Sequence, residues 1–174
     1  MKTILITGMS GVGKTTTILE LQVMGYKTAD LDCDPYSVWV DAESDPEHAD
    51  NEVKPGKDWV WDEPRIRELL AMQEDELLFV SGCASNMSKF YSNFASIILL
   101  TAPEPVIIQR LASRQAGTYG HSPQEMARVL RLKQTIEPML RRAADLEIDT
   151  STSVQSTIAL ILRHIGGSTS PRAS

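Results

Sequence analysis

A glycine-rich loop near the start of the chain constrains the fold more than any other feature. It runs from Gly8 to Thr15 as Gly-Met-Ser-Gly-Val-Gly-Lys-Thr, directly after the apolar run at residues 4–6. This is the complete Gly-x-x-x-x-Gly-Lys-Ser/Thr pattern of the phosphate-binding P-loop, placed after an expected strand and before an expected helix. A fortuitous glycine-rich turn rarely matches all of these positions in that context. The loop therefore predicts an α/β fold that binds the phosphates of a nucleoside triphosphate.

Each residue type in this loop has a chemical reason. The glycines let successive backbone N–H groups curl around phosphate oxygens at the positive end of a helix. Lys14 supplies positive charge to the β- and γ-phosphates, and the Thr15 hydroxyl is placed to coordinate Mg²⁺. We therefore expect ATP and Mg²⁺ as ligands. The residues expected to contact the nucleotide are Gly8, Ser10, Gly11, Val12, Gly13, Lys14, Thr15 and Thr16.

Short apolar runs alternate with helical patterns along the rest of the chain. Strands are expected at residues 3–7, 27–32, 77–82, 96–101 and 146–150. Helices are expected at residues 14–24, 64–72, 103–114, 123–144 and 153–165. The start of the longest helix is marked by Ser122 as N-cap, Pro123 in the first turn and Glu125 completing a capping box. Continuous apolar strands alternating with helices predict a parallel sheet covered by helices on both faces.

Length and composition favour one domain. The 174 residues leave room for a single core, expected over residues 1–165, and the Gly- and Ser-rich tail 166–174 is expected to be disordered. The net charge of −6 argues against nucleic acid as the main partner. No run approaches the ~18 apolar residues of a membrane span, and no signal peptide is visible. We therefore expect a cytoplasmic protein with no membrane partner.

Acidic residues follow the second expected strand rather than the third. The third strand leads into residues 83–86, which contain no carboxylate, so the acidic Walker-B residue of motor-type and switch-type P-loop proteins is missing. Asp32 and Asp34 instead follow the second strand. Side chains two apart on an extended segment point the same way, which would place both carboxylates on one face. The alternative is that both are ordinary polar residues in a turn before Pro35.

These features resemble the shikimate kinase and gluconate kinase branch of the P-loop kinases, which is related to the nucleoside monophosphate kinases. The resemblance rests on the Gly8 loop, the Asp32-x-Asp34 pair, a glycine after the third strand and the stretch at residues 89–91, and it spans about residues 3–165. It implies a three-layer P-loop fold whose five parallel strands have the order 2-3-1-4-5. It also implies phosphate transfer from ATP to a hydroxyl group of a small molecule, with residues 35–72 covering the acceptor and residues 115–122 as a lid.

The resemblance further implies roles for single side chains. Asp32 would help to organise Mg²⁺ through water, and Asp34 would bind the acceptor hydroxyl and take its proton. Arg110 would stack on adenine and Arg114 would clamp the transferring phosphate. These two arginines are four apart, so they share a helix face, and the alternative is that this face is simply solvated. The expected catalytic residues are Lys14, Asp34 and Arg114.

On the acceptor side we expect Trp59, Trp61, Arg65 and Gly82. Trp supplies flat apolar area for a ring, and Arg grips a carboxylate or phosphate with two hydrogen bonds. The alternative is that the two tryptophans only anchor a polar excursion to the core. From the strand order, Cys33 and Cys83 would approach each other beside the site, where we expect two free thiols because a reducing cytosol disfavours a disulfide.

Two departures from the family pattern bear on the function. Residues 115–121 contain no arginine, whereas the lids of many relatives carry one or more, so Arg128 or Arg131 would have to act if Arg114 does not. Ile136 stands where shikimate kinases have an arginine two residues before a proline, so shikimate is not the expected acceptor. Two alternatives stay open: a nucleoside or nucleotide kinase, in which a base stacks on the tryptophans, and a nucleotide-binding regulator that hydrolyses ATP slowly.

Overall fold

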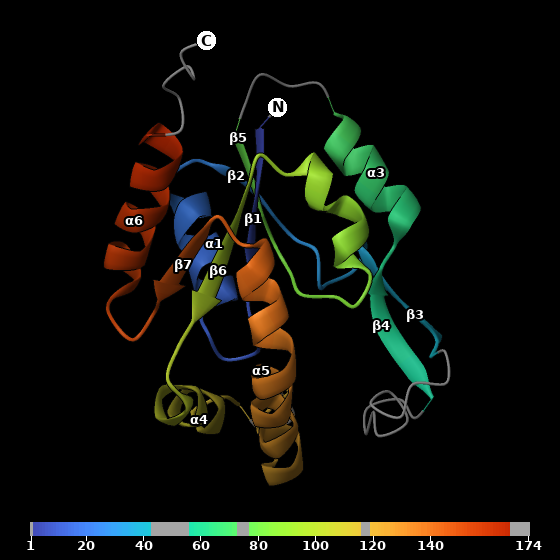
Figure 1. The fold of residues 1–174 in the computed structure, drawn as a ribbon, viewed down its shortest axis with the longest axis vertical. Coiled ribbons are helices and arrows are strands. Elements are labelled where there is room, and N and C mark those ends of the chain that lie inside the picture. The colour runs from blue at the N-terminus through green and yellow to red at the C-terminus, as the bar shows by residue number, and fades with distance from the viewer. Residues whose placement is uncertain (1, 43–55, 73–76, 116–118, 168–174) are drawn as a thin grey trace.

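A parallel sheet of five strands forms the centre of the protein, as the computed structural model of the chain shows (Figure 1). The structure describes residues 2–42, 56–72, 77–115 and 119–167. The strands of the sheet are β1 (Lys2–Thr7), β2 (Lys27–Asp30), β5 (Leu77–Ser81), β6 (Ser96–Thr101) and β7 (Leu146–Asp149). Their spatial order is β2-β5-β1-β6-β7, which confirms the order predicted for the five sheet strands.

Burial explains why β1, β5 and β6 lie in the middle of the sheet. Nearly every residue of these three strands is buried, as expected for strands covered on both faces. The continuous apolar runs of the sequence therefore form the sheet strands, and each strand begins and ends within two residues of the predicted bounds. The largest difference is at β2, which ends at Asp30 and not at Asp32.

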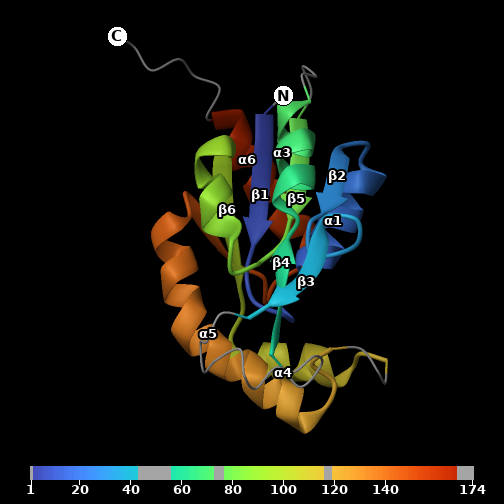
Figure 2. The ribbon, with the colours of Figure 1, turned by 90° about the vertical axis from the view of Figure 1, so that its right-hand side faces the viewer.

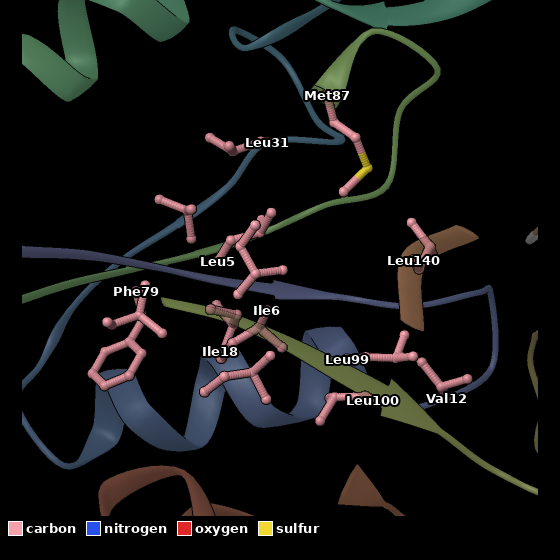
Figure 3. Packing of buried hydrophobic residues seen from close by; sticks show 14 of the residues in the cluster. Leu5, Ile6, Val12, Ile18, Leu31, Phe79, Met87, Leu99, Leu100 and Leu140 are labelled. Carbon is pink, nitrogen blue, oxygen red and sulfur yellow. The ribbon is translucent and has the colours of Figure 1, made fainter. Parts of the chain in front are cut away.

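Helices cover both faces of the sheet. On one face α1 (Lys14–Val23) packs against α6 (Val154–Gly167), and α5 (Pro123–Ala143) packs against β6 on the other (Figure 2). Right-handed crossovers between parallel strands produce this arrangement. Figure 3 shows the resulting core, in which side chains of β1 and β6 lie between Ile18 of α1 and Leu140 of α5.

The start of α5 confirms the capping signature read from the sequence. The Ser122 hydroxyl accepts from the Glu125 N–H at 3.2 Å, and the Glu125 carboxylate accepts from the Ser122 N–H at 3.4 Å. The first turn of this long helix is therefore fixed by its own side chains. The remaining helices are α3 (Glu63–Ala71), the 3₁₀ helix η1 (Met87–Asn93) and α4 (Glu104–Ala112).

A hairpin that the sequence analysis did not predict follows β2. Its antiparallel strands are β3 (Ser37–Asp41) and β4 (Lys57–Trp61). Asn86 joins the hairpin to the end of β5, since its side chain accepts from the Trp61 N–H at 3.0 Å and donates to the Trp61 carbonyl at 2.9 Å. The hairpin therefore stands at the carboxyl end of the sheet, beside the P-loop (Figure 1).

The expected tail and the expected lid lie partly outside the described residues. Helix α6 continues to Gly167 and so includes the first two residues of the expected tail 166–174, and residues 168–174 lie outside the described residues. Residues 116–118 of the expected lid also lie outside them. Within the described ranges, every helix is too short or too polar to cross a membrane.

Candidate active site

The P-loop turns from β1 into α1 through glycines with positive φ. Gly8 has φ +146°, and a Cβ there would lie 2.3 Å from the Leu100 carbonyl oxygen, so no other residue fits without moving β6. Gly13, the N-cap of α1, has φ +100° in the left-handed region. The backbone N–H groups of the loop therefore reach the positive end of α1 in the arrangement that binds phosphate.

Lys14 lies folded over this loop. Its ammonium donates to the Gly8 carbonyl at 2.6 Å and, at 3.4 Å, to the Met9 carbonyl. The positive charge is thus held at the mouth of the loop, where phosphate oxygens would replace the two carbonyls as its partners. Thr15 and Thr16 follow in the first turn of α1. Both are exposed and line the cleft into which the P-loop opens.

Thr150, which follows β7, and Arg110 of α4 form hydrogen bonds with the backbone of the P-loop. The buried Thr150, just after β7, donates its hydroxyl to the Val12 carbonyl at 2.6 Å. Arg110 donates to Thr150 Oγ1 at 3.0 Å and to the Gly11 carbonyl at 3.3 Å. Arg110 therefore lies against the P-loop and not on a solvated face of α4. Sequence analysis missed Thr150, although the end of a parallel strand is where ligands of such folds bind.

Arg114 connects the P-loop with Tyr119, which falls within the expected lid. Its guanidinium donates to Ser10 Oγ at 3.2 Å and to the Tyr119 carbonyl at 2.7 Å. Arg114 thus lies against the P-loop, even though residues 115–121 carry no arginine, and its role toward phosphate stays a prediction. Of the two substitutes considered, Arg128 lines the cleft, whereas Arg131 is exposed and does not line it.

The P-loop opens into a cleft of about 940 Å³. Its walls are the P-loop, the end of β2, the β3–β4 hairpin, α4, α5 and the start of α6. Single ligand pockets range from about 300 to 1,000 Å³. The cleft therefore lies at the upper end of this range, and its walls include both the P-loop and the β3–β4 hairpin.

Asp32 is held rigidly in this cleft. Its Oδ1 accepts from the Cys83 N–H at 2.9 Å and from the buried Trp61 Nε1–H at 3.2 Å, and its Oδ2 accepts from the same Cys83 N–H at 3.0 Å. Gly82 leaves the space for this arrangement, because a Cβ there would lie 2.8 Å from both Asp32 Oδ1 and the Trp61 ring. Gly82 itself is buried and does not line the cleft, so its requirement is steric.

The prediction that Asp32 and Asp34 share a face on an extended segment is wrong. Because β2 ends at Asp30, residues 31–36 form turns and the alternation of a strand does not continue through them. Asp34 is exposed and does not line the cleft, whereas Asp30 and Asp32 both do. The Asp32 N–H donates to Asp30 Oδ1 at 3.1 Å within this turn. The two carboxylates at the end of β2 that line the cleft are therefore Asp30 and Asp32.

The residues predicted on the acceptor side lie in different surroundings. Trp61 is only 1% exposed and packs against the rings of Phe90 and Phe94, so the core-anchor alternative holds for it. Arg65 is exposed on α3, where its nearest carboxylate is Asp62 at 3.7 Å, and it does not line the cleft. Trp59 does line the cleft, and its Nε1–H donates to the Asp32 carbonyl at 2.8 Å.

Trp39 also lines the cleft, and the sequence analysis missed it. It stands opposite Trp59 in the hairpin register, with ring centroids 4.9 Å apart. Along β3, Trp39 alternates with Val38 and Val40, which are exposed, so its ring lies on the opposite face of the strand. The sequence Val38-Trp39-Val40 was the signal that could have placed a large ring on one face of a strand. The hairpin therefore presents a pair of indoles to the cleft.

Both cysteines are free thiols that line the cleft. Burial raises the pKa of the Cys33 thiol, and the charges of Asp30 and Asp32 raise it further. Burial is also the main reason why the pKa of the Cys83 thiol is raised. Since a raised pKa favours the protonated form, neither side chain is an activated thiolate at neutral pH.

The chain is similar to several proteins of known structure. Residues 4–131 match a family model described as an AAA domain. No curated protein matches the chain. A shikimate kinase from Acinetobacter baumannii, solved in complex with shikimate, superposes with a TM-score of 0.66 at 18% identity, and 98% of this chain and 96% of that chain are covered.

Two further solved structures have the same architecture. A shikimate kinase from Bacteroides thetaiotaomicron gives a TM-score of 0.60 at 13% identity over 95% of this chain and 98% of that chain. An unliganded sugar kinase from a Janibacter species gives 0.56 at 16% identity over 95% of each chain. These similarities, at such low identity, establish the P-loop kinase fold that the sequence predicted.

Proposed function

The chain belongs to the AAA domain family, and we propose that it is a kinase that transfers the γ-phosphoryl group of ATP to a hydroxyl group of a small molecule. One observation carries the proposal: a single cleft of about 940 Å³ has the P-loop at one side and two carboxylates with the hairpin at another. Phosphoryl transfer needs both reactants side by side, aligned and shielded from water. A single cleft lined by both groups of residues would bring the two reactants together.

The nucleotide side of the cleft fits the triphosphate of ATP. Backbone N–H groups, Lys14 and Arg114 would bind the phosphates, and Arg110 lies against the loop at Gly11. Thr15 and Asp32 offer the hydroxyl and carboxylate oxygens that Mg²⁺ prefers, and both line the cleft. When bound there, Mg²⁺ would neutralise charge on the β- and γ-phosphates.

On the acceptor side we assign to Asp30 the role that the sequence analysis gave to Asp34. Asp30 ends β2 and lines the cleft, so its carboxylate is placed to accept the hydrogen bond of an acceptor hydroxyl and then its proton. Asp32 is less suited, because its Oδ1 accepts from the Cys83 N–H and the Trp61 Nε1–H and its Oδ2 accepts from the Cys83 N–H, whereas on Asp30 the Asp32 N–H is bound by Oδ1. Its fixed orientation suits a structural role toward the metal ion.

Arg114 supports a transferase over the regulator considered above. That alternative rested on the arginine-free lid, but the hydrogen bond from Arg114 to Ser10 brings a guanidinium against the P-loop, which supports a role for it toward the phosphates. Such a group stabilises the charge of the transferring phosphoryl.

A nucleotide acceptor is less well supported. It would need several arginines on the acceptor side, yet Arg65 and Arg67 of α3 are exposed. They lie near the carboxylates of Asp62 and Glu63, at 3.7 and 3.6 Å. Neither arginine lines the cleft.

The proposal is tested by following ATP with and without a pool of small metabolites. A kinase gives ADP at a rate that depends on the pool, together with a product heavier by one phosphoryl group in mass spectrometry. Lys14→Ala should lower both signals by on the order of 10²-fold or more. ATP hydrolysis that is slow, independent of the pool and without a phosphorylated product would instead establish the regulator.

A further inference from the structure

We propose that the acceptor is a hydroxyl compound that carries a protonated amine, and not a carboxylate or phosphate. This inference rests on the proposed kinase activity and adds the charge of the acceptor to it. It comes from the side chains that the hairpin and the end of β2 present to the cleft.

The indoles of Trp39 and Trp59 form one part of this wall. They lie opposite each other on β3 and β4, with centroids 4.9 Å apart and planes inclined at 53°. The Nε1–H of Trp59 is bound to the Asp32 carbonyl, which fixes the orientation of this ring. Indole faces attract cations and apolar ring faces.

Carboxylates form the rest of the wall. Asp58 of β4 lines the cleft, and its Oδ2 accepts from the Ser85 hydroxyl at 2.6 Å. An ionised carboxylate has about four acceptor positions, so a carboxylate that is already paired can still accept from a ligand. Asp30 and Asp32 line the cleft at the end of β2. Asp32 would share its charge with Mg²⁺ and Asp30 would face the acceptor hydroxyl, so the carboxylate of Asp58 and the two indoles are the groups that favour a positive group on the acceptor and disfavour a negative one.

Cations line the cleft only on its other sides. Among the described residues that line it, the positive side chains are Lys14 and Arg110, Arg114 and Arg128, from α1, α4 and α5. Of the residues described in β3 and β4, the cation is Lys57, which forms an ion pair with Asp41 and does not line the cleft. A carboxylate on the acceptor would therefore have to lie against the carboxylate wall or be held by Arg128.

Matched acceptors test the charge directly. One set is glucosamine, glucose and glucuronate, and a second is 2-deoxystreptamine, myo-inositol and quinate, so that each set contains an amine, a neutral and a carboxylate member. A cell metabolite extract serves as a third source, with every phosphorylated product identified by mass. We expect kcat/KM for an amine member to exceed that of its neutral counterpart about tenfold, as for a hydrogen bond to a charged group.

The outcomes separate the inference about the charge of the acceptor from the proposal that the protein is a kinase. Preference for a neutral or carboxylate member, or an extract product without an amine, overturns the inference and leaves the kinase in place. An amine-bearing product from the extract supports the inference even if both sets are inactive. No phosphorylated product from any source overturns the kinase itself.

Variants of the hairpin test whether Asp58 causes the preference for an amine acceptor. Asp58→Asn should lower kcat/KM for the amine acceptor about tenfold and change that of the neutral acceptor much less, because only the charged contact is lost. Asp58→Arg should move the preference toward the carboxylate member. Asp41→Asn is the matched control on the same hairpin, since its side chain is 89% exposed and does not line the cleft. Turnover of a carboxylate acceptor that depends on Arg128, tested with Arg128→Gln, contradicts the inference.

Discussion

The two sides of the cleft are built in different ways. On the nucleotide side, binding groups come mainly from one continuous loop, and glycine conformations such as φ +146° at Gly8 and +100° at Gly13 set its shape. On the acceptor side, Asp30, Trp39 and Trp59 come from three strands. Asp32 is oriented there by the N–H of Cys83, which is 51 residues away in the sequence.

This difference separates backbone recognition from side-chain recognition. Phosphate binds to N–H groups that every residue has, so a short glycine pattern specifies the site and changes little with the rest of the chain. Acceptor binding depends on which side chains the tertiary structure brings together, and those side chains set its specificity. The first side therefore indicates the class of reaction, and the second indicates its substrate.

The largest effect is expected from removing the charge of the P-loop. Lys14→Ala should lower turnover by on the order of 10²-fold or more, because it removes charge stabilisation from the transferring phosphoryl group. Initial rates of ADP formation measure this effect. Lys89→Ala is a suitable control, since Lys89 lies on η1 in an ion pair with Glu63. Near-normal activity of Lys14→Ala would contradict the assigned role of the loop.

A second test compares the carboxylates after β2. Asp30→Asn should lower kcat by about 10- to 100-fold with little change in the KM for ATP, in the range of general-base effects. Asp34→Asn should change kcat less than twofold, since its exposed side chain does not line the cleft. Asp32→Asn should instead raise the Mg²⁺ concentration needed for half-maximal rate. The reverse ranking of Asp30 and Asp34 would restore the assignment made from the sequence.

The same contrast explains how much the sequence could predict. The five sheet strands and α5 were correct because their signals are local: unbroken apolar runs, and a capping box formed by Ser122 and Glu125. The hairpin was missed because Ser37–Asp41 and Lys57–Trp61 are short, partly exposed and paired across residues that separate them widely. The Asp34 assignment failed because a shift of two residues in the end of β2 decides which carboxylates reach the cleft.

A third test separates the two tryptophans of β4. Trp61→Ala should lower the free energy of unfolding by about 3–5 kcal/mol, because a buried aromatic ring leaves a cavity in the core. At about 2–4 °C per kcal/mol, the Tm would fall by roughly 10 °C. Trp59→Ala should have a smaller effect on stability, since its ring is half-buried, but should raise the KM for the acceptor. Thermal unfolding and acceptor kinetics on both variants check this, and equal loss of stability would contradict it.

The smallest effect concerns the thiols between the two sides of the cleft. Because burial raises the pKa of Cys83 in the folded protein, folding favours its protonated form. Its contribution to stability is therefore complete below the pKa of an unfolded thiol, about 8.5, and is lost as pH rises from there toward the folded pKa. We expect the free energy of unfolding in urea to fall between pH 8 and 9.5 more steeply in the wild type than in Cys83→Ala.

Thiol counting completes this test. Cys33 is exposed and Cys83 half-buried, so a thiol reagent at pH 8 should modify Cys33 first and Cys83 more slowly in the folded protein. In urea, both should react, giving two thiols per chain before and after mild oxidation. Parallel pH profiles for the wild type and Cys83→Ala would contradict the raised pKa. Loss of both thiols on oxidation would instead show that Cys33 and Cys83 come close enough to form a disulfide.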